Sequence, residues 1–246
     1  DIKGIKPIIK IFTLVLVYIF LYSENFIITN LGTLLGIELK LHLLISIVFS
    51  VLSIITFTNA FNLIDGLDGL AGIISLIIFI TLLLIGVTNE DRFIVTISVL
   101  FITSLSVFIY FNWYPAKIFL GDSGSLMIGF VISLLAIRGI NYVEPISILY
   151  IAAVPIIDFL FITIRRISAG NRLFSPDRGH CHHLLLTYFN QNVKKTVISI
   201  AIFQLFFSLF GFLFVSRVED SFLPLVIFIL IFLAIYSFFI NTRNKN

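Results

Sequence analysis

Long apolar runs recur along the whole chain, and they constrain its fold more than any other feature. Eight runs stand out, at 7–23, 41–58, 70–87, 93–111, 125–140, 146–164, 196–216 and 222–240. Each is close to the ~20 residues that a helix needs to cross the hydrocarbon of a bilayer. Of all residues 59% are hydrophobic and only 12% are charged, whereas roughly 25% are charged in soluble domains. We therefore predict an all-α, polytopic membrane protein with these eight spans.

The basic residues divide unequally between the two sides of the membrane that an eight-span topology creates. Twelve of the 16 Lys and Arg fall on one side, which the positive-inside rule makes cytoplasmic. Every Glu falls on the other side, while the cytoplasmic loops carry Asp65, Asp68, Asp122 and Asp177. The net charge of +3 therefore reflects membrane edges rather than one basic face, so we expect no nucleic-acid partner.

The chain reads as a single domain. No linker rich in Pro, Gly or Ser divides it, and the longest polar stretch is the connection 165–195. Residues 24–40 suggest an external loop or a hairpin. The chain begins with Asp1 and its only methionine is Met127, so we expect further N-terminal helices to precede it. We predict one transmembrane domain over 1–246, and the sequence leaves a homodimer open.

The first polar segment, NAFNLIDGLDGLAG at 59–72, places Asn59, Asn62, Asp65 and Asp68 between two predicted spans. Polar side chains at three-residue steps lie near one another on a helix. Two carboxylates and two amides at a membrane edge suit a divalent cation, or the sugar and base of a nucleotide. The alternative is an ordinary loop in which Asp68 caps the helix that follows.

The second segment, KIFLGDSGSLMIG at 117–129, places Asp122 just before another predicted span. The spans that begin at 70 and 125 both direct their N-terminal N–H groups and positive dipole ends toward the cytoplasm, which suits a diphosphate. Mg²⁺ binds one or two carboxylates together with substrate phosphates. Asp122 is thus a candidate metal ligand, and the alternative is that it only caps its helix.

The third segment, RRISAGNRLFSPDRGHCHHLLL at 165–186, is rich in cations and imidazoles. Arginine binds phosphate in a fork, and imidazoles donate to phosphate oxygens or relay protons. The candidate residues here are Arg165, Arg166, Asp177, Arg178, His180, His182 and His183. The positive-inside rule alone also explains arginines at this edge. A zinc site that includes Cys181 is disfavoured, because contiguous ligands do not close a tetrahedron easily, and Cys181 is interpreted as a spacer.

Asp158 lies within a predicted span, where a charge needs a partner. We expect it to pair with Arg165 or Arg166 and so to order the loop that follows. A proton-relay role is the alternative.

Together the strings NLIDGLDGLAG, FLGDSGS and PDRGHCHH, in this order and on one side of the membrane, resemble the polyprenyl-phosphate N-acetylhexosamine-1-phosphate transferases of glycosyltransferase family 4. This family includes phospho-MurNAc-pentapeptide transferase, and the similarity extends over essentially the whole chain. The resemblance implies a multi-pass enzyme of the bacterial plasma membrane with a cytoplasmic active site. It also implies transfer of a UDP-linked amino sugar phosphate to a polyprenyl phosphate such as undecaprenyl phosphate, with release of UMP, in cell-envelope polysaccharide synthesis.

The resemblance also implies roles for particular residues. Asp122 would bind Mg²⁺, or Mn²⁺ in its place, with Asp65 as a second ligand. Asp1 would be a base or organise the phosphate site, and Asn62, Asp65 and Asp68 would contact the nucleotide sugar or surround the metal. We expect Asp65 and Asp68 to be catalytic, and Asn59, on the same segment, to bind substrate with Asn62. His182 and His183 would contact the diphosphate and take part in catalysis. From the chemistry of their side chains, we also expect Arg165, Arg166, Asp177, Arg178 and His180 to bind substrate. The form PDRGHCHH is closer to the N-acetylhexosamine branch and favours UDP-GlcNAc.

Two alternatives remain at this point. The enzyme could belong to the phospho-MurNAc-pentapeptide branch. A cation-coupled membrane transporter is a different class, and it predicts ionisable groups near the middle of the bilayer together with repeats and broken helices.

Overall fold

The computed structural model describes residues 26–168, 170 and 179–243. This part of the chain is mostly helical, with one short antiparallel hairpin. In chain order its elements are β1 (Asn30–Leu34), β2 (Ile37–Lys40), α2 (Leu43–Ile64), α3 (Leu70–Thr88), α4 (Arg92–Asn112), α5 (Gly121–Gly139), α6 (Pro145–Ile151), α7 (Ala153–Ser168), α8 (Cys181–Tyr188), α9 (Val193–Leu213), the 3₁₀ turn η1 (Val215–Arg217) and α10 (Phe222–Arg243).

The predicted class of helical, multi-pass membrane protein is confirmed. Among the described residues, six helices are long and apolar enough to span a bilayer, and α6 with α7 makes a seventh span if the bent pair is counted as one. These seven correspond to seven of the eight predicted runs. The first run, 7–23, lies outside the described residues. The strands β1 and β2 form the hairpin that the segment 24–40 suggested.

Two predicted helix boundaries were wrong, and both lie at the polar segments. Helix α2 continues through Ile64, so Asn59 and Asn62 stand on its last turns instead of in a loop. The Asn59 side-chain amide donates to the Ile55 carbonyl one turn earlier in the same helix. Helix α5 already begins at Gly121, and Asp122 is therefore in its first turn. Both helices thus include polar residues that we had predicted to lie outside them.

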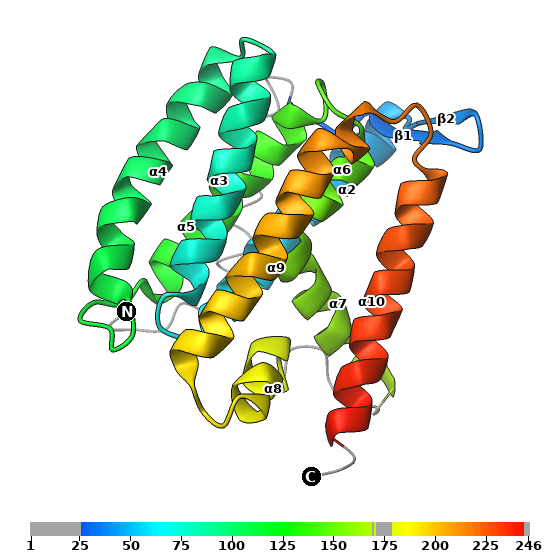
Figure 1. The fold of residues 1–246 in the computed structure, drawn as a ribbon. Coiled ribbons are helices and arrows are strands. Elements are labelled where there is room, and N and C mark those ends of the chain that lie inside the picture. The colour runs from blue at the N-terminus through cyan, green and yellow to red at the C-terminus, as the bar shows by residue number, and fades with distance from the viewer. Residues whose placement is uncertain (1–25, 169, 171–178, 244–246) are drawn as a thin grey trace.

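The helices pack into a bundle whose central members are α3, α5 and α9 (Figure 1). Helix α3 packs against α4 and α9, and α2 packs against α5. Gly129 allows the close approach of α5 to α2, because a Cβ there would lie 3.0 Å from the Thr58 Cα and 2.9 Å from the Phe61 Cβ. Buried Ile, Leu and Phe side chains of α2, α3, α4, α5 and α9 form the main apolar core.

The predicted span 146–164 is broken. Helices α6 and α7 meet at Ala152 with a bend of 86°. Inside a membrane, backbone N–H and C=O groups freed by such a break need hydrogen-bond partners. The Gln204 side chain on α9 is that partner. Its side-chain oxygen accepts from the Val154 N–H at 2.9 Å, and its amide donates to the Ile151 carbonyl at 2.7 Å. This contact fixes the direction in which α7 leaves the break.

Candidate active site

The turn between α2 and α3 carries Asp65 and Asp68, and it is attached to the α4–α5 connection by two hydrogen bonds. The Gly69 N–H donates to the Asn112 side-chain oxygen at 3.0 Å, and the Ala116 N–H donates to Asp68 Oδ2 at 3.0 Å. Gly69 has a φ of 80°, a left-handed conformation that glycine adopts without strain. It is also the N-cap of α3, so the alternative in which Asp68 caps this helix was wrong. Asp68 joins two loops instead.

The first turn of α5 lies against the end of α2. The Asn62 amide donates to Ser125 Oγ at 2.7 Å and lies 3.4 Å from Asp122 Oδ1. The N-cap of α5 is Leu120, so Asp122 is not the capping residue either. A polar pocket of about 320 Å³ opens here. Its lining residues are Asn62, Asp65, Gly66, Leu67, Asp68, Asn112, Phe119, Gly121 and Asp122.

The charges in this pocket favour a cation. Burial, together with the negative charge of Asp122, raises the pKa of Asp65 to about 6. Two carboxylates that disfavour each other's ionisation are stabilised when a positive charge lies between them. Their oxygens are the ligand type that Mg²⁺ binds. Asp65 and Asp122 are therefore the residues of this pocket that suit a divalent ion.

The histidine segment contacts the Asp65–Asp68 turn beside this pocket. Helix α8 begins at Cys181, and His182 on it is 3% exposed. A Cβ added at Gly66 would collide with the Nε2 of His182, so this imidazole lies directly on the Asp65–Asp68 turn. Burial lowers the pKa of His182 to about 4, helped by the charges of His183 and His180, and the ring is neutral at pH 7. The three polar segments therefore meet at one end of the bundle.

Asp158 on α7 connects to this histidine segment. Its Oδ2 lies 2.7 Å from His180 Nδ1, and its Oδ1 accepts from the Cys181 N–H at 2.6 Å. We expected partners in Arg165 or Arg166, and the partners that the structure gives are His180 and Cys181. These contacts tie α7 to the start of α8; the effect on the loop between them stays a prediction, because most of that loop lies outside the described residues.

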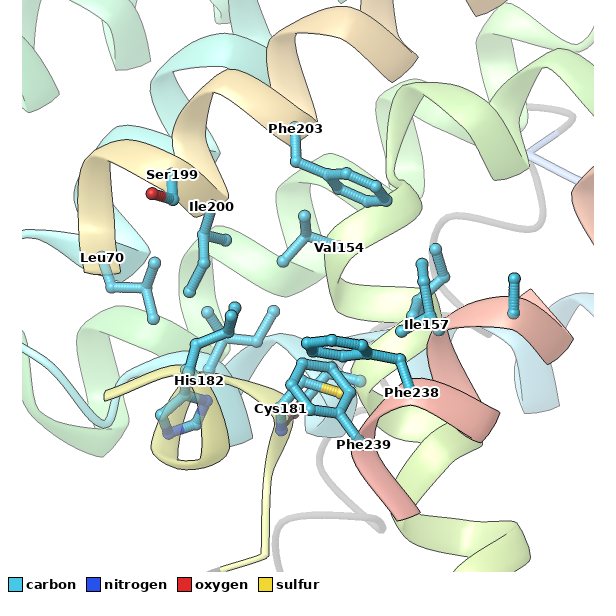
Figure 2. A pocket seen from close by; sticks show the side chains of 15 residues that line it. Leu70, Val154, Ile157, Cys181, His182, Ser199, Ile200, Phe203, Phe238 and Phe239 are labelled. Carbon is cyan, nitrogen blue, oxygen red and sulfur yellow. Dashed lines mark hydrogen bonds between the residues drawn. The ribbon is translucent and has the colours of Figure 1, made fainter. Parts of the chain in front are cut away.

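An apolar cavity of about 460 Å³ lies behind the histidines, between α7, α8, α9 and α10. Figure 2 shows His182 at one edge of it, near Leu70 and Ile200, and Cys181 beside Phe238 and Phe239. Cys181 packs among apolar side chains, in agreement with its interpretation as a spacer. Within the described part of the chain, Asp158, His180 and His182 have possible ligand atoms within 4.8 Å of one another. Both oxygens of Asp158 already accept hydrogen bonds, which favours a hydrogen-bonded group over an open metal site.

The remaining candidates are placed less centrally. Asn59 bonds within its own helix and is not among the pocket-lining residues. Arg165 and Arg166 end α7, where Arg166 is 7% exposed and Arg165 packs over Gly179. The His183 ring lies 4.3 Å from that of His182, centre to centre. Asp1, Asp177 and Arg178 lie outside the described residues.

Sequence reasoning missed three residues, two that fix local structure and one that lines the pocket. Asn112 bonds to Gly69 and to the Ile118 carbonyl, Gln204 closes the break at Ala152, and Phe119 is 75% exposed at the pocket. A signal existed for Gln204, because an amide inside an apolar span needs a partner. No sequence pattern indicated the partners of Asn112.

Comparisons with known proteins identify relatives of this chain. The model of glycosyl transferase family 4 matches residues 1–140. A probable undecaprenyl-phosphate N-acetylglucosaminyl 1-phosphate transferase of Bacillus subtilis (strain 168) is 36% identical over 164 residues, which cover 64% of this chain and 45% of that protein. The undecaprenyl-phosphate alpha-N-acetylglucosaminyl 1-phosphate transferase of Pasteurella multocida (strain Pm70) is 43% identical over 74 residues, covering 28% of this chain and 21% of that protein.

The protein of the same name from Escherichia coli (strain K12) is 39% identical over 74 residues, covering 28% of this chain and 20% of that protein. The chain thus spans less than half the length of each of these relatives. The family model, in contrast, covers more than half of the chain and includes the segments of Asp65 and Asp122. This multi-pass membrane protein belongs to glycosyl transferase family 4.

Proposed function

We propose that residues 1–246 are the catalytic transmembrane domain of an enzyme that transfers GlcNAc 1-phosphate from UDP-GlcNAc to a polyprenyl phosphate such as undecaprenyl phosphate. A phosphate oxygen of the lipid bonds to the β-phosphorus of the nucleotide sugar, and the bond from that phosphorus to UMP breaks. The observation that carries the proposal is the meeting of Asp65, Asp122 and His182 at one end of an apolar helix bundle. The names of the relatives support the choice of sugar and lipid.

The residues of the pocket fit a divalent ion, and we propose that Asp65 and Asp122 hold Mg²⁺, with Mn²⁺ as a substitute. When bound, the ion would neutralise charge on the diphosphate. The side chains and backbone of the pocket would position the substrate. Asn62 bonds to Ser125 and approaches Asp122, and the first N–H groups of α5 offer donors to an anion. Asp68 holds the α4–α5 connection beside the pocket.

The base and the sugar need further contacts. The exposed ring of Phe119 offers a face on which a nucleotide base can stack, and its position at the pocket edge supports that role. His182, with its buried Nε2, lies next to the pocket. We propose that His183, Arg165, Arg166 and the undescribed Asp177 and Arg178 complete a phosphate site, with Asp1 as a base or organiser.

The rival class, a cation-coupled transporter, predicted broken helices, and one broken span is present within the described part of the chain. The groups that close this break are the neutral side chains Gln204 and Ser208, however, and not ionisable residues. The carboxylates of the pocket lie where α2 ends and α5 begins. This arrangement favours an enzyme at the membrane edge over a path through the bilayer.

A release assay tests the proposal. Purified full-length protein is incubated with UDP-GlcNAc and undecaprenyl phosphate in micelles, and UMP is measured with Mg²⁺ and with a chelator. We expect UMP only with the metal, and a loss of at least ~100-fold in Asp122→Asn. Asp220→Asn is the control, because this aspartate bonds to Gly36 and Phe222 near the hairpin.

Three outcomes contradict the proposal. Turnover of UDP-MurNAc-pentapeptide in place of UDP-GlcNAc would assign the other branch. Cation flux into proteoliposomes without UMP release would favour a transporter. Normal turnover of Asp122→Asn would exclude the proposed metal ligand.

A further inference from the structure

Asp158 is a buried carboxylate outside the polar pocket, and the proposed chemistry does not use it directly. It is 3% exposed and stands on α7, beyond the break at Ala152. The contacts of Gln204 with Ile151 and Val154 set the direction of α7. The fold thus directs this charge toward the start of α8.

Both oxygens of Asp158 are used at the start of α8. One accepts the Cys181 N–H at 2.6 Å, an amide of the first helical turn that has no partner within its own helix. The helix does not cap itself, since the N-cap His180 makes no side-chain capping bond. Asp158 therefore caps α8 from another helix, and a carboxylate is the favourable charge at that end.

The other oxygen lies 2.7 Å from His180 Nδ1. A carboxylate only accepts, so this contact requires the hydrogen of His180 on Nδ1. The same carboxylate fixes both the tautomer of one histidine and the position of the helix that carries the next two. The rings of His180 and His182 stack at 5.4 Å between centres, which transmits the position of one to the other.

The end of this chain of contacts is the Nε2 of His182. This atom is buried and has no hydrogen-bond partner among the described residues. It lies against Gly66, within the Asp65–Asp68 turn. A buried polar atom without a partner is unfavourable unless a ligand completes it. The pocket beside it is where the proposed substrates bring phosphate oxygens.

We propose that Asp158 is a positioning residue: through His180 and the Cys181 amide it holds the His182 imidazole against the Asp65–Asp68 turn, ready to bond to a phosphate oxygen of the reacting molecules. This inference rests on the proposed function. Outer partners of this kind change activity by roughly 10- to 100-fold when removed.

Asp158→Asn tests the role with little change in shape. The Asn oxygen can still accept the Cys181 N–H, but its NH₂ then faces His180 Nδ1 and forces the hydrogen of that ring onto Nε2. In the full-length protein we expect kcat for UMP release to fall roughly 10- to 100-fold, with KM for UDP-GlcNAc changed less than about threefold. ¹⁵N-histidine spectra should show the His180 tautomer reversed, with the signal assigned through His180→Gln.

Asp91→Asn is the matched control. Asp91 is also a buried carboxylate that caps a helix, α4, and accepts hydrogen bonds from the Arg138 and Tyr142 side chains. It lies at the end of the bundle opposite the pocket. The Asp91→Asn substitution should lower thermal stability without changing kcat or the His180 signal. In a double-variant cycle, Asp158→Asn should add no further loss to His180→Gln, because one acts through the other.

Equal kcat in Asp158→Asn and wild type, or additive losses in the cycle, would overturn the positioning role. A wild-type His180 protonated on Nε2 would overturn it as well, whatever the activity. If the wild type shows the Nδ1–H tautomer but releases no UMP from any UDP-amino sugar, the proposed function fails while the positioning geometry stands.

Discussion

Asp65 and Asp68 stand three residues apart in the same turn, yet their surroundings give them different tasks. Asp65 faces Asp122 and carries a pKa raised to about 6 by burial and by that neighbouring charge. Asp68 gives one oxygen to the Ala116 N–H and so holds the α4–α5 connection. Loss of Asp68 would therefore move the loop that carries Phe119, and its effect on activity would combine chemistry with position.

Phe119 gives a prediction at the scale of one side chain. Replacing it with Ala removes the exposed ring at the pocket edge, and stacking on an aromatic ring contributes about 1–3 kcal/mol per base. We expect KM for UDP-GlcNAc to rise roughly tenfold while KM for the lipid stays constant, and Phe119→Tyr to behave like the wild type. Equal effects on both substrates would show that the ring only supports the loop. Steady-state kinetics with each substrate varied in turn measures this.

Asp91 gives a pH-dependent prediction. Burial alone would raise its pKa, but hydrogen bonds from the Ile94 N–H, the Tyr142 hydroxyl and Arg138 outweigh burial and lower the pKa. A lowered pKa means that the stabilisation is complete at neutral pH and is lost as the pH falls below the ordinary value near 4. Asp91→Asn should cost about 2 kcal/mol at pH 7.

The measurement is the thermal midpoint in micelles across a pH series. The deficit of Asp91→Asn against the wild type should shrink as the pH falls below about 4, because the wild-type carboxyl then also loses its charge. A deficit that grows toward acid pH would contradict the sign of this pKa shift.

At the scale of elements, the contact between α2 and α5 sets the distance between Asn62 and Asp122. Gly129→Ala places a Cβ 3.0 Å from the Thr58 Cα and 3.1 Å from its carbonyl oxygen, so the helices must separate slightly. We expect a cost of about 1–3 kcal/mol and a loss of kcat of roughly tenfold through misplacement of the pocket.

The matched control is Gly139→Ala on the same helix, where a Cβ would meet only Ile148 Cδ1, at 4.0 Å. This variant should retain its melting temperature and its rate of UMP release. If both glycine variants lose activity equally, the close approach of α2 and α5 is not what sets the pocket.

The described elements were predictable to the extent that hydropathy determines them. The membrane spans follow from the apolar runs, and the three polar segments identified the loops that meet. The break at Ala152 was not predictable, because apolar residues continue through it and its partner, Gln204, is distant in sequence. The partners of Asp158 and Asn112 were missed for the same reason. A polar residue in a span indicates that a partner exists, but the sequence does not indicate which residue it is.

At the scale of the whole molecule, the two ends of the bundle differ in chemistry. The end with α8 gathers the carboxylates of the pocket and the imidazoles beside it, and the hairpin of β1 and β2 lies at the opposite end (Figure 1). At that end, Arg138 and Tyr142 both donate to Asp91, and Asp220 accepts from the Gly36 N–H. These contacts stabilise the opposite end without contributing to the pocket.

This polarity predicts which end faces the cytoplasm. In a Cys181→Ser background, single cysteines replace Lys40 on β2 and Lys117 in the α4–α5 connection, two exposed lysines at opposite ends. Because basic residues concentrate at the pocket end, the positive-inside rule places Lys117 inside and Lys40 outside. A membrane-impermeant thiol reagent should label Lys40→Cys in intact cells and Lys117→Cys only after permeabilisation. Labelling of Lys117→Cys in intact cells would place the pocket outside, where no nucleotide sugar from the cytoplasm could reach it.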